Sequence, residues 1–426
     1  MTDDPLPFSE TDLHQWDLLG HFRQRLLAPG AAKLHPSWSD PKRHAQDADY
    51  LSLFLFGLLH PALRTMRALC AASLWERVRR EVCTQSRSRG SFSEAQHLVE
   101  PAALEQIFGD LVAAVPGPVP AEPRAAWQQW FARDSSLFAA RPRLSWALDG
   151  GGKAGAKNNA VRLHLSFHLL DDKPARAPIT PGQSCERKVW RTDWQAGAAD
   201  VGDRSFAEHD ALLGEWQERG CRYVLRLCDK AVVNVEEELP VSAAERAAGV
   251  TRQVWARLGA RPAGRSERER VVWIALAAGG DLRLVPNVSP DDLDAAEVGL
   301  LDRRRWQIEC FFRWLKCLLG CRHWLAESER GVTIQLYLAL IASVLLPLAT
   351  GRRPDKRLLE LIQMDQLGWA SLAELEAGVA RAAAAARKKS KSAAPGRLRS
   401  SRPEGGAMPR DQRRPGPAPR VLLARR

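Results

Sequence analysis

A single glutamate stands in a row of cations in the segment from Asp302 to Lys316. On a helix, which turns by about 100° per residue, Glu309 falls on one face with Arg305, Arg313, Lys316 and Asp302. Such spacing can form a solvated ladder of ion pairs. It also suits a carboxylate that binds a metal ion beside cations that hold phosphate groups. The rest of the chain has to separate these two interpretations.

Two aspartates stand at the ends of short apolar runs, where a strand would deliver a carboxylate to the edge of a sheet. Asp149 follows the run Leu144–Leu148 and precedes Gly150–Gly152, and Asp203 follows Ala199–Val201. A turn-forming role is the alternative for each aspartate. Two strand-end acids and one acid on a basic helix face form the ligand set of a two-metal site for phosphoryl transfer.

The elements that position these acids follow from the periodicity of the apolar residues. Residues 1–138 show three- and four-residue spacing, which predicts an all-α N-terminal domain. Short strand-like runs then begin, and helices return near residue 291. The expected divisions are 139–229 for the first part of an α/β core, 230–290 for an antiparallel β block, 291–350 for the second part of the core with the helix of Glu309, and 351–386 for a C-terminal helical segment.

The basic charge of the chain is concentrated at one end. The net charge is +12, but residues 387–426 contain thirteen Lys or Arg and two acids, which gives +11 and leaves +1 for the rest. This tail is rich in Pro, Gly, Ser and Arg, so it is expected to be disordered and to contact phosphates without sequence preference. Any nucleic acid that binds elsewhere must be bound by local patches.

The cysteines and apolar runs indicate a cytoplasmic protein that does not cross a membrane. Eight cysteines are scattered through the chain, and no secretory signal precedes them, so reduced thiols are expected. No Cys-x-x-Cys pair occurs, which disfavours a zinc site. The apolar runs Leu51–Leu59 and Ile334–Ala349 are shorter than a bilayer span requires and predict buried helices.

The helix of Glu309 resembles a stretch found in the DDE transposases of bacterial insertion sequences. One subgroup of that family has a β-strand insertion between its second Asp and its Glu, and carries the signature Tyr-x2-Arg-x3-Glu-x6-Lys. Arg305, Glu309 and Lys316 match this spacing, whereas Asp302 stands in the place of the tyrosine. Asp302 therefore either repels a DNA end or pairs with Arg305 three residues later.

The resemblance implies a ribonuclease H-like core, interrupted by the β block, in which Asp149, Asp203 and Glu309 bind two Mg²⁺ ions that Mn²⁺ can replace. It further implies that Arg305, Arg313 and Lys316 contact the phosphates of the DNA end.

The activity that the resemblance implies is cleavage of double-stranded DNA at the terminal inverted repeats of an insertion sequence, followed by joining of the 3′-hydroxyl ends to target DNA. A homodimer would act on paired ends, and the helical N-terminal domain, residues 1–138, would bind them. Two alternatives remain open: a nuclease that cleaves without strand transfer, and a DNA-binding relic whose catalysis Asp302 has impaired.

Overall fold

A computed structural model of the chain describes most of its first 350 residues. The described ranges are 17–28, 40–115, 130–139, 160–191, 197–207, 215–259, 268–277, 279–317 and 324–350, followed by isolated positions between 360 and 384. Asp149 and the basic tail 387–426 lie outside the described residues.

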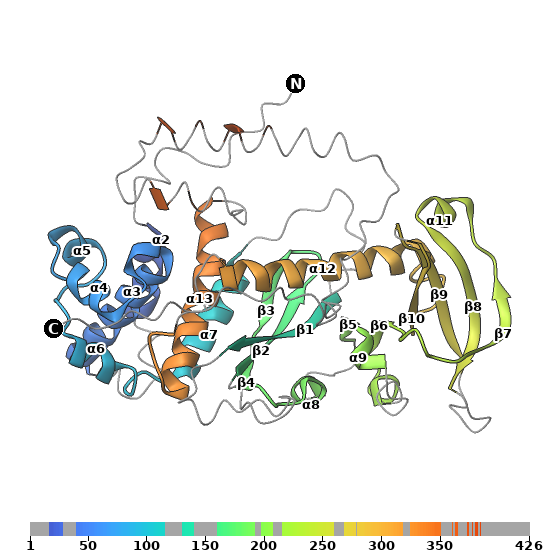
Figure 1. Cartoon of the computed structure of the whole chain (residues 1–426), viewed down its shortest axis with the longest axis horizontal. Helices are drawn as coiled ribbons and strands as arrows, with labels where there is room; N and C mark the ends of the chain where they lie inside the picture. The colour runs from blue at the N-terminus through green and yellow to red at the C-terminus, as the bar shows by residue number, and fades with distance from the viewer. Residues whose placement is uncertain are drawn as a thin grey trace, which may run out of the picture.

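The described residues up to 115 form helices. They are α2 (Asp17–Leu27), α3 (Pro41–Leu59), the 3-10 helix η3 (Pro61–Leu63), α4 (Met66–Ala72), α5 (Glu76–Glu81), α6 (Arg89–Ala95) and α7 (Pro101–Ala114). Helix α3 begins where the Asp40 side chain accepts a hydrogen bond from the Lys42 backbone N–H, with Pro41 in the first turn. Helices α3 and α7 pack against α13 (Glu329–Thr350), which joins this region to the C-terminal part of the chain (Figure 1).

A mixed sheet forms the centre of the molecule and confirms the α/β prediction. Its first strands are β1 (Trp130–Ala139), β2 (Ala160–His168), β3 (Lys173–Arg176), β4 (Ile179–Pro181), β5 (Ala199–Gly202) and β6 (Arg222–Arg226). Strand β2 lies antiparallel to β1, β3 and β4. Strand β5 lies parallel to both β1 and β6. The order across this part of the sheet is β3-β2-β1-β5-β6.

Four antiparallel strands extend the same sheet beyond β6. They are β7 (Val233–Leu239), β8 (Val250–Leu258), β9 (Glu269–Ala275) and β10 (Asp281–Pro286), in the order β10-β9-β8-β7. Strand β10 pairs with β6, so this outer block is continuous with the centre. Between β7 and β8, helix α11 (Ala243–Ala247) begins with a capping box formed by Ser242 and Glu245.

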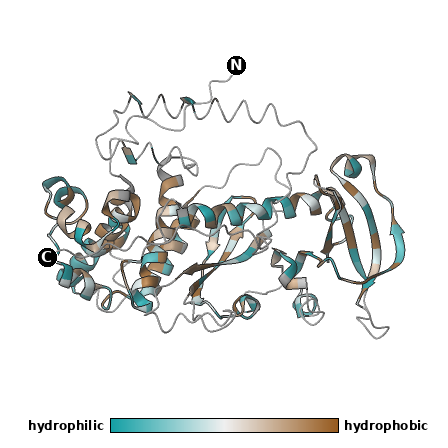
Figure 2. Cartoon of the chain, in the orientation of Figure 1, coloured by the Kyte–Doolittle hydropathy of each residue, from teal (hydrophilic) through white to brown (hydrophobic). Residues whose placement is uncertain are grey.

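Two long helices follow the outer block in the chain. Helix α12 (Ala295–Cys317) crosses the sheet from α13 to the outer block and contacts β1, β5, β6 and β8 to β10 (Figure 1). Helix α13 is apolar around most of its circumference, as the brown ribbon in Figure 2 shows. Its stretch Glu329–Leu346 is long and apolar enough for a membrane span, but 83% of it is buried inside the protein, as in a core helix of a soluble protein.

The start of the sheet differs from the sequence-based expectation. Strand β1 covers 130–139, and all but its last residue lies in the stretch 1–138 that was predicted to be helical. The strand expected at Leu144–Leu148 lies outside the described residues. Strand β1 alternates buried Trp130 and Ala132 with partly exposed Phe131, but charged residues interrupt this alternation in the middle of the strand.

Candidate active site

The ends of two parallel strands bring two aspartates side by side. In the register of β1 against β5, Ala132 lies opposite Val201. Two residues further along each strand come Asp134 and Asp203. Neighbouring strands lie about 4.8 Å apart and residues two apart share a face. The two carboxylates therefore occupy neighbouring positions on the same face of the sheet.

The next strand adds a guanidinium to the same row. In the register of β5 against β6, Gly202 lies opposite Leu225, so Arg226 follows in line with Asp203. Parallel strands in α/β proteins commonly bind ligands in the crevice outside their carboxyl ends. Asp203 and Arg226 stand at that edge, and β1 continues past it to carry Asp134 there.

Helix α12 lies over this row and presents charged side chains to it. The Arg305 guanidinium Nη1 lies 3.0 Å from Glu309 Oε1, one helical turn away. Asp302, one turn before, is buried and accepts two hydrogen bonds of 2.7 Å from Arg226. Lys316 Nζ donates a 2.7 Å hydrogen bond to Ser136 of β1. The helix face that the sequence marked as basic is therefore held against the strand ends.

The carboxylates are close enough to influence each other's protonation. Burial, together with the charges of Asp203 and Glu309, raises the pKa of Asp134 to about 7, although Arg305 and a hydrogen bond from the Ser135 backbone act in the opposite direction. A carboxyl whose pKa is raised by burial and by like charges gains from a cation placed among them.

A fourth acid, Glu186 on the short helix α8 (Glu186–Trp190), lies close enough to interact electrostatically with Asp134 and Asp203. Burial raises the pKa of Glu186 to about 8, and the charges of Asp134 and Asp203 add to the effect, while a hydrogen bond with Ser135 and the charge of Arg162 oppose it. Arg162 itself donates to the Ser135 hydroxyl at 3.0 Å. Acidic side chains at or near this site thus come from β1, the residue after β5, α8 and α12.

A buried ion pair supports the strands beneath the cluster. Arg133 Nε donates to Asp200 Oδ1 at 2.8 Å, and the Arg133 guanidinium lies 4.6 Å from the ring centroid of Trp190. Because side chains alternate along a strand, Arg133 and Asp200 point to the opposite face from Asp134. Strands β1 and β5 therefore each contribute one residue to the ion pair on one face of the sheet and one aspartate to the cluster on the other face.

The structure brings together four of the residues that were expected to form the site: Asp203, Glu309, Arg305 and Lys316. Arg313 is exposed on the same helix, with its guanidinium 5.8 Å from the Trp306 ring centroid. Asp149 lies outside the described residues.

Asp134, Arg226 and Glu186 were not identified from the sequence. The available signal for Asp134 was its place in the alternation Trp130, Ala132, Asp134, where an acid occupies the apolar face of a strand. For Arg226 the signal was its place in its strand. Arg226 comes four residues after Arg222, as Asp203 comes four residues after Ala199, and Ala199 and Arg222 lie opposite each other in the sheet. No pattern in the sequence pointed to Glu186.

The donor set of hard carboxylate oxygens fits a divalent cation such as Mg²⁺. Within the part of the chain that the structure describes, however, no three His, Cys, Asp or Glu side chains already converge on one point. Arg305 lies against Glu309 in this arrangement and supplies part of the positive charge. Holding an ion would require Glu309 to turn from Arg305 toward the aspartates.

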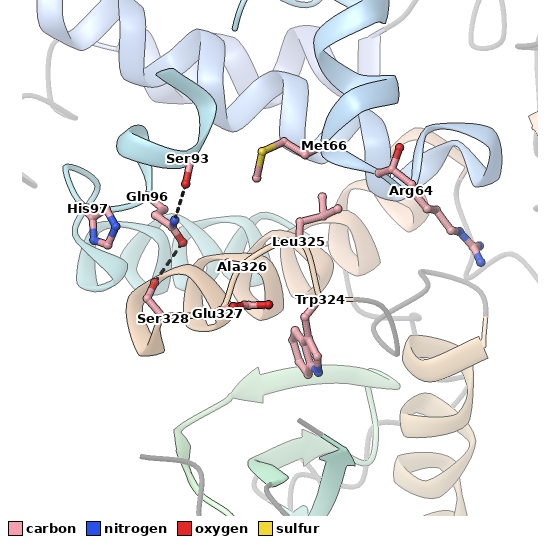
Figure 3. A pocket seen from close by; sticks show the side chains of 11 residues that line it. Arg64, Met66, Ser93, Gln96, His97, Trp324, Leu325, Ala326, Glu327 and Ser328 are labelled. Atoms are coloured by element: carbon pink, nitrogen blue, oxygen red, sulfur yellow. Dashed lines mark hydrogen bonds between the residues drawn. The ribbon is translucent and has the colours of Figure 1, made fainter. Parts of the chain in front are cut away.

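A separate hollow of about 690 Å³ lies between the N-terminal helices and the segment that leads into α13 (Figure 3). Gln96 bridges the two sides, because its amide donates to Ser93 Oγ at 3.4 Å and accepts from Ser328 Oγ at 3.0 Å. A Cβ at Gly331 would lie 2.2 Å from Gln96 Oε1. The hollow lies beside this close contact between Gln96 and Gly331, and none of its lining residues belongs to the carboxylate cluster.

Comparison with known proteins gives three findings. Residues 128–345 match the family described as transposase DDE domain. The chain is 27% identical over 212 residues to a probable transposase for insertion sequence element IS5377 of Geobacillus stearothermophilus, which covers 50% of this chain and 54% of that protein. The chain thus spans about half the length of this relative.

Among solved structures, the piggyBac transposase synaptic complex with hairpin DNA aligns with 87% of this chain at a TM-score of 0.42 and 8% identity. A likeness at that level bears on neither the fold nor the function.

Proposed function

Because the chain belongs to the transposase DDE-domain family, as its match over residues 128–345 shows, we propose that it cuts DNA at the terminal inverted repeats of an insertion sequence and joins the 3′-hydroxyl ends to target DNA. The observation that carries the proposal is the row of Asp134 and Asp203 across two parallel strands, with Glu309 of α12 above it. The ribonuclease H-like core, the β block as an insertion and the cytoplasmic location are parts of the same proposal.

Asp134, Asp203 and Glu309 would hold two Mg²⁺ ions, or Mn²⁺ in their place, and these ions would activate the attacking oxygen and stabilise the leaving one. Asp149 is the alternative for the first position. The register favours Asp134, because it stands beside Asp203 on the neighbouring strand. In this arrangement the carboxylates must be deprotonated to bind, which the raised pKa of Asp134, about 7, opposes until a cation arrives.

Cations on and under α12 would bind the phosphates of the DNA end. Arg305 and Arg226 present planar guanidiniums suited to two phosphate oxygens, and Lys316 a point charge. Lys316 is poised at Ser136, with its Nζ 4.9 Å from the ring centroid of Phe138. Arg313 is exposed further along the helix and would contact the backbone away from the scissile phosphate.

The N-terminal helices supply a second basic surface, which we propose as the part that grips the DNA away from the cut. Its exposed arginines are Arg67, Arg77, Arg79, Arg80 and Arg89. Two large apolar side chains lie exposed among them, Leu74 at 67% and Trp75 at 56%. Exposed arginines beside an exposed aromatic side chain suit a nucleic-acid backbone and its bases. Two copies of the chain would act on paired ends.

The proposal is tested with purified protein and a labelled DNA fragment that carries the inverted repeat flanking the gene. Wild-type protein with Mg²⁺ is expected to nick the repeat at its end and to join that end to a target plasmid, whereas Glu309→Gln and Asp203→Asn should bind the fragment without cutting it. Glu297→Gln, in the first turn of α12, is the matched control and should cut like wild type.

The same assay separates the alternatives. Cutting without joined products identifies a nuclease. Binding of the repeat without metal-dependent cutting by the wild type identifies a DNA-binding relic and contradicts the proposal. A wild-type protein that neither binds nor cuts its repeat also contradicts it.

A further inference from the structure

Asp302 occupies the centre of a charge network that links α12 to the end of β6. Its side chain is 3% exposed, and its two oxygens accept one hydrogen bond each from Arg226 Nε and Nη2, both at 2.7 Å. This two-point contact fixes the plane of the guanidinium as well as its position. Arg226 stands in line with Asp203 on the neighbouring strand, so Asp302 determines which way a cation faces at the carboxylate cluster.

A second guanidinium is shared between Asp302 and Glu309. Arg305 Nε lies 3.8 Å from Asp302 Oδ1, while its Nη1 lies 3.0 Å from Glu309 Oε1. The Arg305 side chain is only 4% exposed, so it has little access to water as a substitute partner. The network of Arg226, Arg305, Asp302 and Glu309 therefore contains two positive and two negative charges.

We propose that Asp302 is a positioning residue that holds Arg226 in place and receives Arg305 when Glu309 turns to a divalent cation. The inference rests on the proposed function of the cluster. Without a metal ion, both guanidiniums are matched by carboxylates. Once Glu309 binds a cation, one carboxylate serves two guanidiniums, and the surplus positive charge faces the strand ends where a DNA phosphate would lie.

This arrangement couples metal binding to binding of the DNA end. Coupling between two sites is reciprocal, so each ligand should tighten the other by the same factor. Ca²⁺ binds the same carboxylate oxygens as Mg²⁺ but with longer and more flexible geometry, so the effect on binding can be measured under conditions where cleavage is first checked to be absent. A negative residue at this position thus makes end binding conditional on the metal ion.

The test compares the dissociation constant of a fluorescent inverted-repeat fragment in EDTA and in Ca²⁺. For wild type we expect Ca²⁺ to tighten binding by about 10-fold. For Asp302→Asn we expect tighter binding in EDTA, because one negative charge is gone, and a Ca²⁺ effect of less than about 2-fold. Cleavage in Mg²⁺ at saturating DNA should fall by roughly 10- to 100-fold, as for other residues that orient a metal site.

A purely structural role for Asp302 is separated by removing both partners together. Arg226→Met combined with Asp302→Leu leaves no buried charge without a partner, and such replacements commonly preserve folding. If the pair only supports the fold, this variant, checked by circular dichroism, should keep the wild-type Ca²⁺ effect on end binding, even though the loss of Arg226 weakens binding as a whole. We expect it to fold and to show a Ca²⁺ effect as small as that of Asp302→Asn. Glu238→Gln, which breaks an exposed ion pair on β7, controls for loss of a charge.

Two results overturn the proposal: a Ca²⁺ effect on end binding that is as large in Asp302→Asn as in wild type, or wild-type binding that does not respond to Ca²⁺. Neither result touches the proposed function, which depends on whether Asp203→Asn and Glu309→Gln abolish cleavage. Conversely, a wild type that never cleaves would contradict the proposed function while the binding comparison still decides the role of Asp302.

Discussion

Ion pairs occur both at the carboxylate cluster and on the outer block of strands, but in opposite surroundings. Around the cluster, the pairs Arg133–Asp200 and Arg226–Asp302 have aspartate side chains that are 2% and 3% exposed. On the outer block, Arg252–Glu238 and Arg268–Glu237 join side chains of which each is more than 40% exposed. Figure 2 shows the hydrophilic ribbon of β7 that carries these outer glutamates.

The difference shows that the contribution of an ion pair to the stability of the fold depends on its burial. An exposed pair gains little, since water already solvates both charges. A buried pair gives up much solvation, so removing one partner leaves a charge that nothing compensates. The inner pairs therefore hold their side chains in fixed positions, whereas the outer pairs contribute little to the stability of the fold.

The largest expected effect distinguishes the two candidates for the first metal-binding aspartate. Asp134→Asn should reduce end cleavage by about 1,000-fold or more, which corresponds to about 4 kcal/mol of transition-state stabilisation, while Asp149→Asn should cleave within a few-fold of wild type. Single-turnover cleavage of the repeat measures both. The reverse pattern would assign the position to Asp149 and leave Asp134 as a supporting residue.

The next effect concerns the stability of the sheet. Asp200→Asn removes the buried carboxylate that pairs with Arg133 beneath the cluster, so unfolding in urea should become easier by about 3 to 5 kcal/mol. Replacing both residues, with Arg133→Met and Asp200→Leu, should recover most of that loss. A single variant as stable as wild type would show that the pair contributes no more than a surface pair.

A buried histidine gives a smaller effect that depends on pH. His164 is buried on β2, where its Nε2 lies 2.9 Å from Thr180 Oγ1, and burial, assisted by the charge of Arg162, lowers its pKa to about 4. The His164 side chain is therefore protonated below about pH 6.5 in the unfolded chain, but only below about pH 4 in the folded chain. Stability is lost as pH falls from about 6.5 toward 4, by up to about 3 kcal/mol.

His164→Gln should remove this loss, and the difference between the two urea curves across the pH range isolates it. The comparison is needed because Asp134 and Glu186, whose pKa values are raised, act in the opposite direction. Parallel curves for the two proteins would contradict the assignment to His164.

The smallest effect is expected on the outer block. Glu238→Gln removes an exposed partner of Arg252, and the urea midpoint should stay within the error of its measurement. Raising the salt concentration, which screens exposed charges, should likewise leave the difference in midpoint between Glu238→Gln and wild type unchanged. A loss comparable to that of Asp200→Asn would break the distinction between inner and outer pairs.

Patterns in the sequence were sufficient where packing alone decides the structure. The four outer strands lie within residues 230–290, the stretch that was expected to form an antiparallel β block. Helix α12 and the strand-end position of Asp203 were likewise predicted. Both follow from local periodicity and from an apolar run that ends in an acid.

Prediction failed where the strand carries the site itself. Strand β1 places Arg133 and Asp134 in its interior, and a polar interior hides the two-residue alternation of a strand. Their presence is explained only by partners that are distant in the sequence, since Asp200 lies 67 residues from Arg133. Local rules fail most often at functional sites for this reason. The contact between Arg226 and Asp302, 76 residues apart, was hidden in the same way.

Strand β7 ends the sheet, and this has a consequence for how copies of the chain can meet. An edge strand offers unpaired backbone groups to any other strand, which invites two sheets to fuse. The exposed acids Glu236, Glu237 and Glu238 lie on this edge and are engaged by arginines of the same block. A strand that docked there would have to strip water from three ion pairs. Copies of the chain at high concentration are thereby hindered from pairing with each other at this edge.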